Sequence, residues 1–346
     1  MKKEVLYNKK GRGILEDELM SEKFERVTAS FYRYYTLSDP EALRDDLFLK
    51  LNALKILGRI YVSKEGINAQ FSVPDYYWDQ FLDTLDSIQG LEKVKIKIAL
   101  QGGRSFFKLT IKVRDELVAY GVPEGSYDMR NVGKHLSAQE YNFAMDHPDT
   151  IVVDMRNYYE SEIGRFDGAI IPDVEKSKDL LEQVKQKLEG KEERHILLYC
   201  TGGIRCEKAS SYLIKQGFEN VNQLQGGIIQ YAHEIKEKGL PSKFKGKNFV
   251  FDERLGERVT DDILANCHIC SYPCDNHTDC KNDACHILFI QCNNCAKTLN
   301  GCCSKDCQDF AALPIEEQKK LRKQPDNVVS KTFFDSRIKP KLKSLI

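Results

Sequence analysis

The sequence predicts a multidomain α/β protein, and three features support this prediction. At 346 residues, the chain is long enough to form two or three domains with separate hydrophobic cores. Strand-like and helix-like segments alternate between residues 27 and 114. All of the 12 cysteines except Cys200 and Cys206 lie between Cys267 and Cys307, which marks a separate cysteine-rich module.

The N-terminal segments follow the order of a ferredoxin-like (acylphosphatase-like) α/β sandwich. Residues 27–35 are rich in aromatic and β-branched side chains, which favour a strand. Asp39 and Pro40 suit the N-cap and first position of a helix, and Pro74 opens a second helix. The helices are expected to end near residues 57 and 88, with further strands at 59–63, 67–73, 93–100 and 106–114. The β-α-β-β-α-β order indicates this sandwich.

The last two of these strands carry a run of positive charge. Apolar residues alternate with cations, so a strand places the two kinds on opposite faces. No Asp or Glu occurs between residues 93 and 114. The seven cations are Lys93, Lys95, Lys97, Arg104, Lys108, Lys112 and Arg114. Two interpretations are open: an ordinary solvated sheet face, or a docking surface for a polyanion such as RNA.

Cys200 is the candidate catalytic residue, because it follows the apolar run 196–199 and precedes a helix-like run from Glu207 to Gln216. A thiol between a strand end and a helix start meets backbone N–H groups and the positive end of the helix dipole, which favour the nucleophilic thiolate. The rest of the predicted active-site loop is Thr201, Gly202, Gly203, Ile204, Arg205 and Cys206.

The length of the Cys200 loop limits the size of the ligand that it can hold. Four residues separate Cys200 from Arg205, one fewer than in the similar loop of cysteine-dependent phosphatases, so the cradle suits a terminal sulfur atom better than a phosphate. A buried structural cysteine is the alternative, but a double glycine and an arginine are not needed to end a core strand. Cys206 either resolves an oxidised Cys200 or packs inward on the helix.

Two Cys-x-x-Cys pairs in the cysteine-rich module have the spacing of a structural zinc site. They are formed by Cys267 with Cys270 and by Cys292 with Cys295. Candidates for a second site are Cys274, Cys280, Cys285, Cys302, Cys303 and Cys307. An iron–sulfur cluster and disulfides are the alternatives, because spacing alone does not distinguish them. Any such cross-link would order a segment with few large aliphatic residues.

Residues 136–242 resemble the rhodanese (sulfurtransferase) domain. The resemblance rests on the Asp154-x-Arg156 motif, on the segments 164–172 and 224–228, and on the Cys200 loop. It implies a rhodanese-like α/β domain with a parallel sheet and a persulfide on Cys200. It also implies that Asp154 and Arg156 support the loop through a buried ion pair. Arg165 departs from the pattern, because it stands where the family usually has histidine.

Nearly the whole chain resembles the TrhO family of rhodanese-related tRNA uridine hydroxylases, through its N-terminal domain, residues 200–206 and residues 267–274. The resemblance implies a tRNA modification enzyme that uses molecular oxygen as co-substrate to convert the wobble uridine into 5-hydroxyuridine. Its partners would be tRNA and an electron or sulfur donor that the sequence does not identify. Two alternatives are a thiosulfate- or persulfide-dependent sulfurtransferase without an RNA substrate, and a noncatalytic RNA-binding or sulfur-carrier adaptor.

The composition and motifs of the chain indicate which cofactors and which cellular compartment to expect. The 52 basic residues balance the 52 acidic ones, so net charge names no partner. No nucleotide or flavin motif is present, and no apolar run approaches the ~18 residues of a membrane span. The N-terminus lacks a signal-peptide pattern. Together with a reactive thiol, this predicts a cytoplasmic protein without a membrane partner.

These observations predict six consecutive parts. They are an N-terminal segment 1–20, a ferredoxin-like domain 21–118, a linker 119–135, a rhodanese-like catalytic domain 136–246, a cysteine-rich module 247–310 and a basic C-terminal tail 311–346.

Overall fold

The computed structural model describes residues 6, 8, 10–123, 125–174 and 177–322. The chain divides into two compact units. The first contains Met1–Val152, Gly190–Pro241 and Val250–Arg254, and the second contains Val153–Glu189, Ser242–Phe249 and Leu255–Ile346. Most of the predicted basic tail, from residue 323 onward, lies outside the described residues. The described part of the tail contains α11 (Ile315–Arg322).

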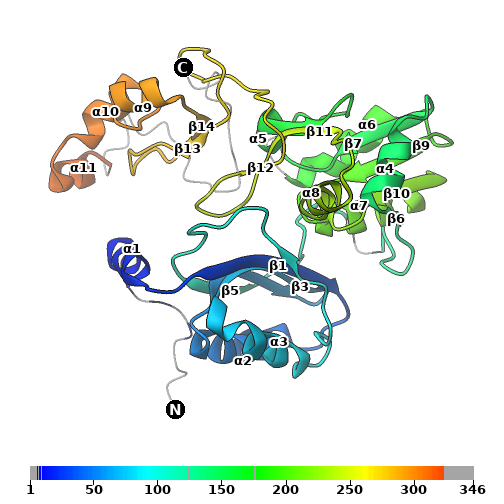
Figure 1. Cartoon of the computed structure of the whole chain (residues 1–346), viewed down its shortest axis with the longest axis horizontal. Helices are drawn as coiled ribbons and strands as arrows, with labels where there is room; N and C mark the ends of the chain where they lie inside the picture. The colour runs from blue at the N-terminus through cyan, green and yellow to red at the C-terminus, as the bar shows by residue number, and fades with distance from the viewer. Residues whose placement is uncertain (1–5, 7, 9, 124, 175–176, 323–346) are drawn as a thin grey trace. The chain divides into compact units, whose positions relative to one another are not determined.

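The first unit begins with α1 (Arg12–Ser21) and a sandwich of the predicted ferredoxin-like type. The five strands are β1 (Arg26–Tyr34), β2 (Leu57–Ser63), β3 (Gly66–Pro74), β4 (Lys97–Ile98) and β5 (Leu109–Val113), in the order β4-β1-β3-β2-β5. The helices are α2 (Pro40–Ala53), the 3₁₀ turn η1 (Asp75–Tyr77) and α3 (Trp78–Asp86). Figure 1 shows α2 and α3 on the same side of this sheet.

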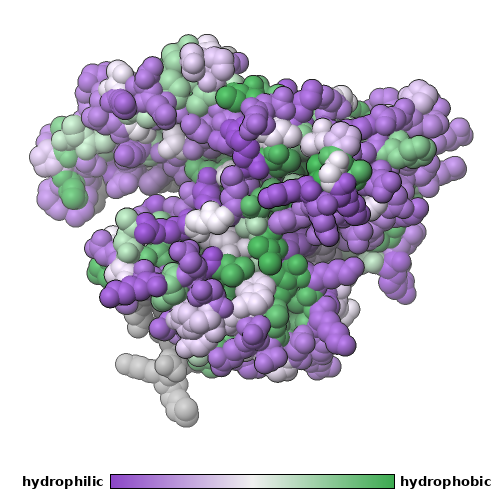
Figure 2. Space-filling view, viewed as in Figure 1, coloured by the Kyte–Doolittle hydropathy of each residue, from purple (hydrophilic) through white to green (hydrophobic). Residues whose placement is uncertain are grey.

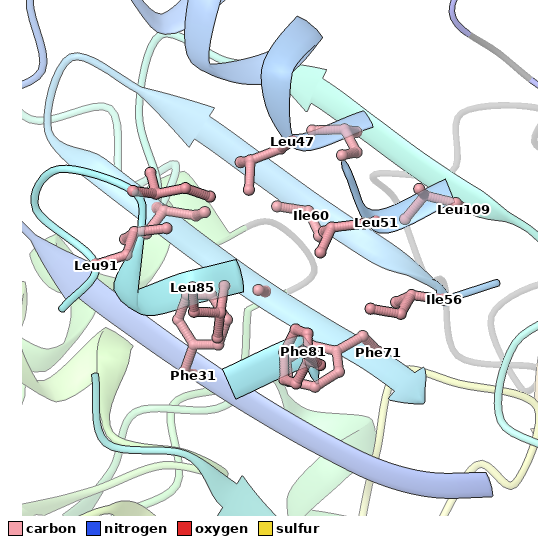
Figure 3. Close-up of a cluster of buried hydrophobic side chains, with 14 of the residues drawn as sticks. Phe31, Leu47, Leu51, Ile56, Ile60, Phe71, Phe81, Leu85, Leu91 and Leu109 are labelled. Carbon is pink, nitrogen blue, oxygen red and sulfur yellow. The ribbon is translucent and has the colours of Figure 1, made fainter. Parts of the chain in front are cut away.

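Local sequence explains where these elements begin. The Asp39 side chain accepts a hydrogen bond from the Ala42 N–H at 3.0 Å, so it is the predicted N-cap of α2. Strands β2 and β3 form an antiparallel hairpin whose last pair joins Ser63 to Gly66. Phe31, Leu47 and Phe71 belong to the buried cluster between the helices and the sheet (Figure 3). The opposite face of the sheet therefore carries the residues that alternate with this core.

The expected strand 93–100 is the main difference from the sequence analysis. Only Lys97–Ile98 pair as a strand, because Lys93 adopts a left-handed φ of 50° and its N–H bonds the Asp86 carboxylate at 2.7 Å in a turn. The strand 106–114 is likewise shortened to β5. Since β4 and β5 are the two edges of the sheet, the predicted cations do not form neighbouring rows.

The first unit also contains most of a parallel sheet with the order β6-β10-β9-β7. Its strands are β6 (Lys134–Leu136), β7 (Thr150–Asp154), β9 (His195–Tyr199) and β10 (Asn220–Leu224). The helices of this part are α4 (Ala138–Met145), α7 (Ile204–Lys215) and α8 (Gly227–Lys238). Strand β10 pairs in parallel with both β6 and β9, as predicted for a rhodanese-like domain.

The second unit combines the remaining α/β elements with the cysteine-rich module. Its first elements are α5 (Tyr158–Ile163), β8 (Gly164–Phe166), η2 (Ser177–Asp179), α6 (Leu180–Leu188), β11 (Phe244–Asn248) and β12 (Glu257–Arg258). The module follows with β13 (His277–Asp279), β14 (Leu288–Ile290), α9 (Asn293–Thr298) and α10 (Lys305–Ala311). Strands β12, β11 and β8 form one sheet, and β13 pairs with β14.

Hydrophilic residues cover most of the face seen in Figure 2. Among the described residues, no helix combines the length and the apolar character that crossing a membrane requires.

Candidate active site and metal centres

Cys200 lies directly after β9, and the loop that it begins closes on the start of α7. Gly203 has a left-handed φ of 100° and its N–H donates to Cys200 Sγ at 3.1 Å. Glycine adopts this conformation without a Cβ penalty. Helix α7 begins at Ile204, earlier than the expected Glu207, so Arg205 and Cys206 lie in its first turn. The Cys200 sulfur therefore faces the amide-rich end of a helix.

The Cys200 side chain is fully buried, yet its surroundings are polar. Burial by itself raises the pKa of the thiol, but several groups outweigh it. A hydrogen bond from the Cys206 thiol, the charge of Arg205 and the N–H groups of Cys206 and Gly203 together lower the pKa of Cys200 from 9.0 to about 6. The same hydrogen bond adds to burial in raising the pKa of Cys206. Cys200 is therefore the thiolate at neutral pH and Cys206 the thiol.

The backbone around the loop is fixed from both sides. The N–H groups of Ile228 and Ile229, in the first turn of α8, donate to the carbonyl oxygens of Cys200 and Thr201 at 3.0 and 3.2 Å. Arg205 donates from Nη2 to the Thr201 hydroxyl at 3.1 Å. The first turn of α8 thus holds the start of the loop, and the Arg205 guanidinium joins Thr201, near the start of the loop, to the first turn of α7.

The N-terminal sheet contacts this loop and α7 within the first unit. Tyr32 donates its hydroxyl to Glu207 Oε1 at 2.9 Å, and Tyr34 donates to the Ile204 carbonyl at 3.3 Å. A Cβ placed on Gly203 would lie 2.7 Å from Tyr32 Oη. Both tyrosines alternate with the core residue Phe31 along β1, so they project from the face opposite the helices. This face of the sheet is therefore packed against the reactive loop rather than fully solvated.

Glu207 collects several of these contacts. Besides Tyr32, it accepts hydrogen bonds from His135 Nε2 at 2.8 Å and from Gln223 Nε2 at 3.1 Å. Burial raises the pKa of Glu207, but these donors outweigh it and the pKa is lowered. The hydrogen bond to Glu207 raises the pKa of His135. The carboxylate therefore remains charged beside the loop.

The seven predicted cations occupy different environments. Lys93 and Lys95 are exposed near β4, while Lys108, Lys112 and Arg114 are exposed on or beside β5, at the other edge of the sheet. Arg104 is exposed in the segment between them and contacts the sulfur of Met20. Lys97 alone is half-buried, with its ammonium 4.4 Å from the centroid of the Tyr32 ring.

Asp154 and Arg156 form the expected buried ion pair in the second unit. Arg156 Nη2 lies 2.8 Å from Asp154 Oδ2, and neither side chain has exposed surface. Arg156 also donates to the Gly164 carbonyl at 2.6 Å, and Ser161 donates to Asp154 at 2.7 Å. Arg165, which replaces the usual histidine, donates to the Ser161 carbonyl at 3.1 Å. These contacts fix the backbone after β7.

The structure gathers the module's cysteines into two groups of four. The first group consists of the predicted Cys267, Cys270, Cys292 and Cys295, and the second of Cys280, Cys285, Cys303 and Cys307. Within each group the sulfurs lie within 4.8 Å of one another, and either group could hold a metal ion. Cys274 and Cys302, the other two second-site candidates, fall outside both groups.

The sulfur spacing matches a single tetrahedral ion. Zinc–sulfur bonds of ~2.3 Å give a tetrahedron with edges of ~3.8 Å. Cys270 Sγ lies 3.6 Å from Cys292 Sγ, and Cys303 Sγ lies 3.7 and 3.6 Å from those of Cys285 and Cys307. A cluster with several irons between its ligands would need wider spacing. The chemistry of four thiolates suits zinc.

Sequence reasoning missed the residues that surround the loop from other elements. Tyr32, Tyr34 and His135 have no motif that marks them, since their role comes from packing across long sequence separations. Glu207 adjoins the predicted loop, but its partners come from β1, β6 and β10. The local signal for Tyr32 and Tyr34 was the aromatic character of β1. Aromatic residues favour strands in general, so this signal did not mark the two tyrosines as part of a site.

Three protein families match consecutive parts of the chain. The UPF0176 acylphosphatase like domain matches residues 26–117, the Rhodanese-like domain matches residues 137–234, and the Rhodanase C-terminal family matches residues 245–308. Among solved structures, the Alr3790 protein from Anabaena sp. aligns with 32% of this chain and 91% of its own, at 25% identity and a TM-score of 0.26.

Relatives match over almost the full length. A protein from Leptospira interrogans named tRNA uridine(34) hydroxylase is 48% identical over 345 residues, covering 99% of this chain and 94% of its own. Proteins of the same name from Pectobacterium carotovorum and Yersinia pestis are 46% and 48% identical, each covering 93% of this chain and 92% of its own. With all three domains matched and a rhodanese loop around an ionised cysteine, the chain belongs to the tRNA uridine(34) hydroxylase family.

Proposed function

We propose that this protein hydroxylates C5 of uridine 34, the wobble uridine of tRNA, with molecular oxygen and with Cys200 as the reactive group. The observation that carries the proposal is the Cys200 sulfur, held ionised at a strand–helix corner by Cys206, Arg205 and loop amides. Full-length relatives with the name tRNA uridine(34) hydroxylase support the substrate. A tRNA substrate also favours the cytoplasm as the site of action.

The chemistry proposed for Cys200 is nucleophilic. Its thiolate adds to C6 of the uracil ring, which places electron density on C5 and prepares that carbon for oxidation. One atom of molecular oxygen enters at C5, and the other leaves as water after a donor outside the chain supplies two electrons and solvent two protons. Departure of the sulfur from C6, with loss of the C5 proton, restores the ring. A persulfide on Cys200 would present its terminal sulfur in the same loop, and intact mass under non-reducing conditions distinguishes the two forms.

The decisive experiment is nucleoside analysis of tRNA from a strain that lacks the gene, complemented with the wild type or with Cys200→Ser. We expect 5-hydroxyuridine derivatives to be restored by the wild type and absent with Cys200→Ser. Loss of thiolated nucleosides instead would indicate a sulfurtransferase acting on RNA. Unchanged tRNA in the deletion strain would reject RNA modification, and full restoration by Cys200→Ser would reject a catalytic role for this sulfur.

We infer that the exposed cations hold the tRNA backbone, since lysine and arginine bind phosphates without reading the sequence. The candidates are Lys93, Lys95, Arg104, Lys108, Lys112 and Arg114. Because the anticodon base must leave its stack to reach a sulfur, docking and base extrusion are separate events. Lys93→Ala with Lys95→Ala tests one sheet edge, and Lys108→Ala with Lys112→Ala tests the other. Each pair should weaken tRNA binding and flatten its salt dependence, and an edge without this effect is not part of the docking surface.

The Asp154–Arg156 pair is proposed to support the Cys200 loop, because β7, which Asp154 ends, is a neighbour of β9 in the parallel sheet. Arg156→Met would leave a buried carboxylate unpaired, so it should destabilise the protein by about 3 kcal/mol. If this pair supports the loop, the pH profile of Cys200 alkylation should also shift in the variant. A loss of stability with an unchanged profile would limit the pair to a purely structural role.

Both cysteine groups are proposed to bind zinc in a structural role, since four thiolates leave no open coordination position. We expect two equivalents of zinc in anaerobically purified protein and unfolding of the module on chelation. Cys270→Ser and Cys303→Ser should each remove about one equivalent. Cys274→Ser and Cys302→Ser are the matched controls, because these cysteines lie outside both groups. Bound iron with sulfide would identify a cluster instead, and less than one equivalent of any metal would reject the sites.

A further inference from the structure

Lys97 differs from its neighbours Lys93 and Lys95 in its surroundings. It is half-buried where they are exposed, and its ammonium lies 4.4 Å from the centroid of the Tyr32 ring. A cation at this distance over an aromatic face is attracted to it. The Tyr32 hydroxyl in turn bonds Glu207 and adjoins Gly203. The Lys97 side chain is therefore directed toward the reactive loop.

Gly226 and Gly227, at the start of α8, lie between Lys97 and the backbone of Cys200 in the chain of contacts. A Cβ placed on Gly226 would lie 3.5 Å from Lys97 Cε, and one placed on Gly227 would lie 2.6 Å from the Cys200 carbonyl oxygen. Strand β4 is fixed there, because the Ile98 carbonyl is hydrogen-bonded to His233 Nε2 of α8 at 2.9 Å. The lysine stem thus lies close to Gly226, and the next residue, Gly227, lies close to the start of the loop.

We propose that Lys97 is a positioning residue of the Cys200 site: its ammonium, supplied by the N-terminal domain, joins Arg205 in stabilising the Cys200 thiolate. The inference concerns the same sulfur as the proposed function, and it removes Lys97 from the set of phosphate-binding cations. The N-terminal domain then contributes to the reactive site as well as to RNA docking.

The charges around Lys97 are consistent with this role. Burial lowers the pKa of Lys97 to about 8, while Cys200 and Glu207 favour its charged form and Lys95 opposes it. The ammonium is therefore mostly protonated at pH 7. Cys200 itself faces Cys206 and Arg205 on its own loop. A half-buried cation near a buried thiolate is favourable because each charge reduces the cost of removing the other from water.

The test measures the rate of Cys200 alkylation by iodoacetamide against pH in the full-length protein, read on the Cys200 peptide by mass spectrometry. This readout needs no tRNA, so it separates the present inference from the proposed function. We expect Lys97→Met to raise the midpoint by about 0.5 to 1 unit, which lowers the rate below the midpoint about 3- to 10-fold. Lys97→Arg should restore the wild-type midpoint.

Two further variants identify the cause. Lys93→Met removes an exposed cation from the same segment and should leave the midpoint unchanged, whereas Arg205→Met should raise it. Should Lys97→Met not fold, Lys97→Gln serves in its place, with the thermal unfolding of each variant recorded. A midpoint in folded Lys97→Met or Lys97→Gln equal to that of the wild type would overturn the proposal and leave Lys97 as a packing partner of Tyr32.

Discussion

Tyr32 donates its hydroxyl to Glu207 Oε1 at 2.9 Å, so a strand of the N-terminal sheet contacts the helix that follows the reactive loop. Burial, followed by the charge of Glu207, raises the pKa of Tyr32 well above its ordinary value. The hydroxyl therefore stays protonated and donates at any physiological pH. This contact fixes β1 against the first turns of α7.

Replacing Tyr32 with phenylalanine tests the strength of this contact. Glu207 keeps its bonds from His135 and Gln223, so we expect a loss of about 1–2 kcal/mol in the free energy of unfolding by urea. Tyr35→Phe is the matched control, because the buried Tyr35 hydroxyl has no hydrogen-bond partner among the described residues. Equal effects of the two substitutions would show that the Glu207 bond contributes nothing.

The lowered pKa of Cys200 predicts its reactivity profile. Only the thiolate is alkylated, so the rate should reach half of its maximum near pH 6 and be nearly constant above pH 7. Cys206→Ala removes the thiol that donates to Cys200, so the midpoint should move upward, toward the ordinary value of 9.0. The measurement is iodoacetamide alkylation of the Cys200 peptide between pH 4.5 and 9. A wild-type midpoint above pH 8 would contradict the electrostatic account of the loop.

The surroundings of Gly227 predict that Gly227→Ala destabilises the protein far more than Gly190→Ala does. Gly227 and Gly190 have similar left-handed φ values of 69° and 74°. A Cβ on Gly227 would lie 2.6 Å from the carbonyl oxygens of Cys200 and Thr201. A Cβ on Gly190 would have no non-neighbouring atom of the described residues within 4 Å. Gly190→Ala should therefore cost about 1 kcal/mol of unfolding free energy, and Gly227→Ala about 2–3 kcal/mol more.

The same pair separates conformational strain from damage to the loop. Gly227→Ala should also raise the alkylation midpoint of Cys200, because the carbonyl that it displaces belongs to Cys200 itself. Gly190→Ala should leave that midpoint in place. If both variants lose equal stability, the contact with the Cys200 loop is more tolerant than the backbone positions indicate.

Local patterns in the sequence were sufficient to predict most of the fold. The Asp39 cap, the hairpin between Ser63 and Gly66 and the strand before Cys200 depend on residues close to one another in the chain. The strand 93–100 was the largest exception, because Lys93 lies in a turn in which its N–H bonds the Asp86 carboxylate, and alternation of side chains does not reveal this turn. Alternation of lysine with apolar residues therefore overestimated the length of β4.

The candidate site was predictable only where a motif is contiguous. Cys200, Arg205 and the two Cys-x-x-Cys pairs are visible in the sequence because glycine, charge or spacing marks them. The second cysteine group was not, since Cys302 and Cys303 are adjacent and only the backbone decides which sulfur faces the group. The placement of Lys97 beside the reactive loop comes from tertiary packing, which no local pattern encodes.

Of the substitutions considered, replacement of Lys208 is expected to cause the largest loss of stability. Its side chain has no exposed surface, and its ammonium lies 2.8 Å from Glu65 Oε1 and 2.7 Å from Glu116 Oε2. Burial lowers the pKa of Lys208, but these two carboxylates outweigh it and raise the pKa. Lys208→Met leaves both carboxylates without this cation, so we expect a loss of about 3–5 kcal/mol in urea unfolding at pH 7.

Charge neutralisation and pH both test this origin. Adding Glu65→Gln and Glu116→Gln to Lys208→Met should recover most of the loss, because no buried charge is then unpaired. Burial raises the pKa of Glu65, but its hydrogen bonds from Lys208 and Tyr127 lower it overall, so its contribution is present above its ordinary pKa of 4.5 and is lost as pH falls through the lowered value. The difference between wild type and Lys208→Met should therefore shrink below pH 4.5. A difference that stays constant from pH 7 to pH 4 would attribute the loss to packing of the lysine stem instead of its charge.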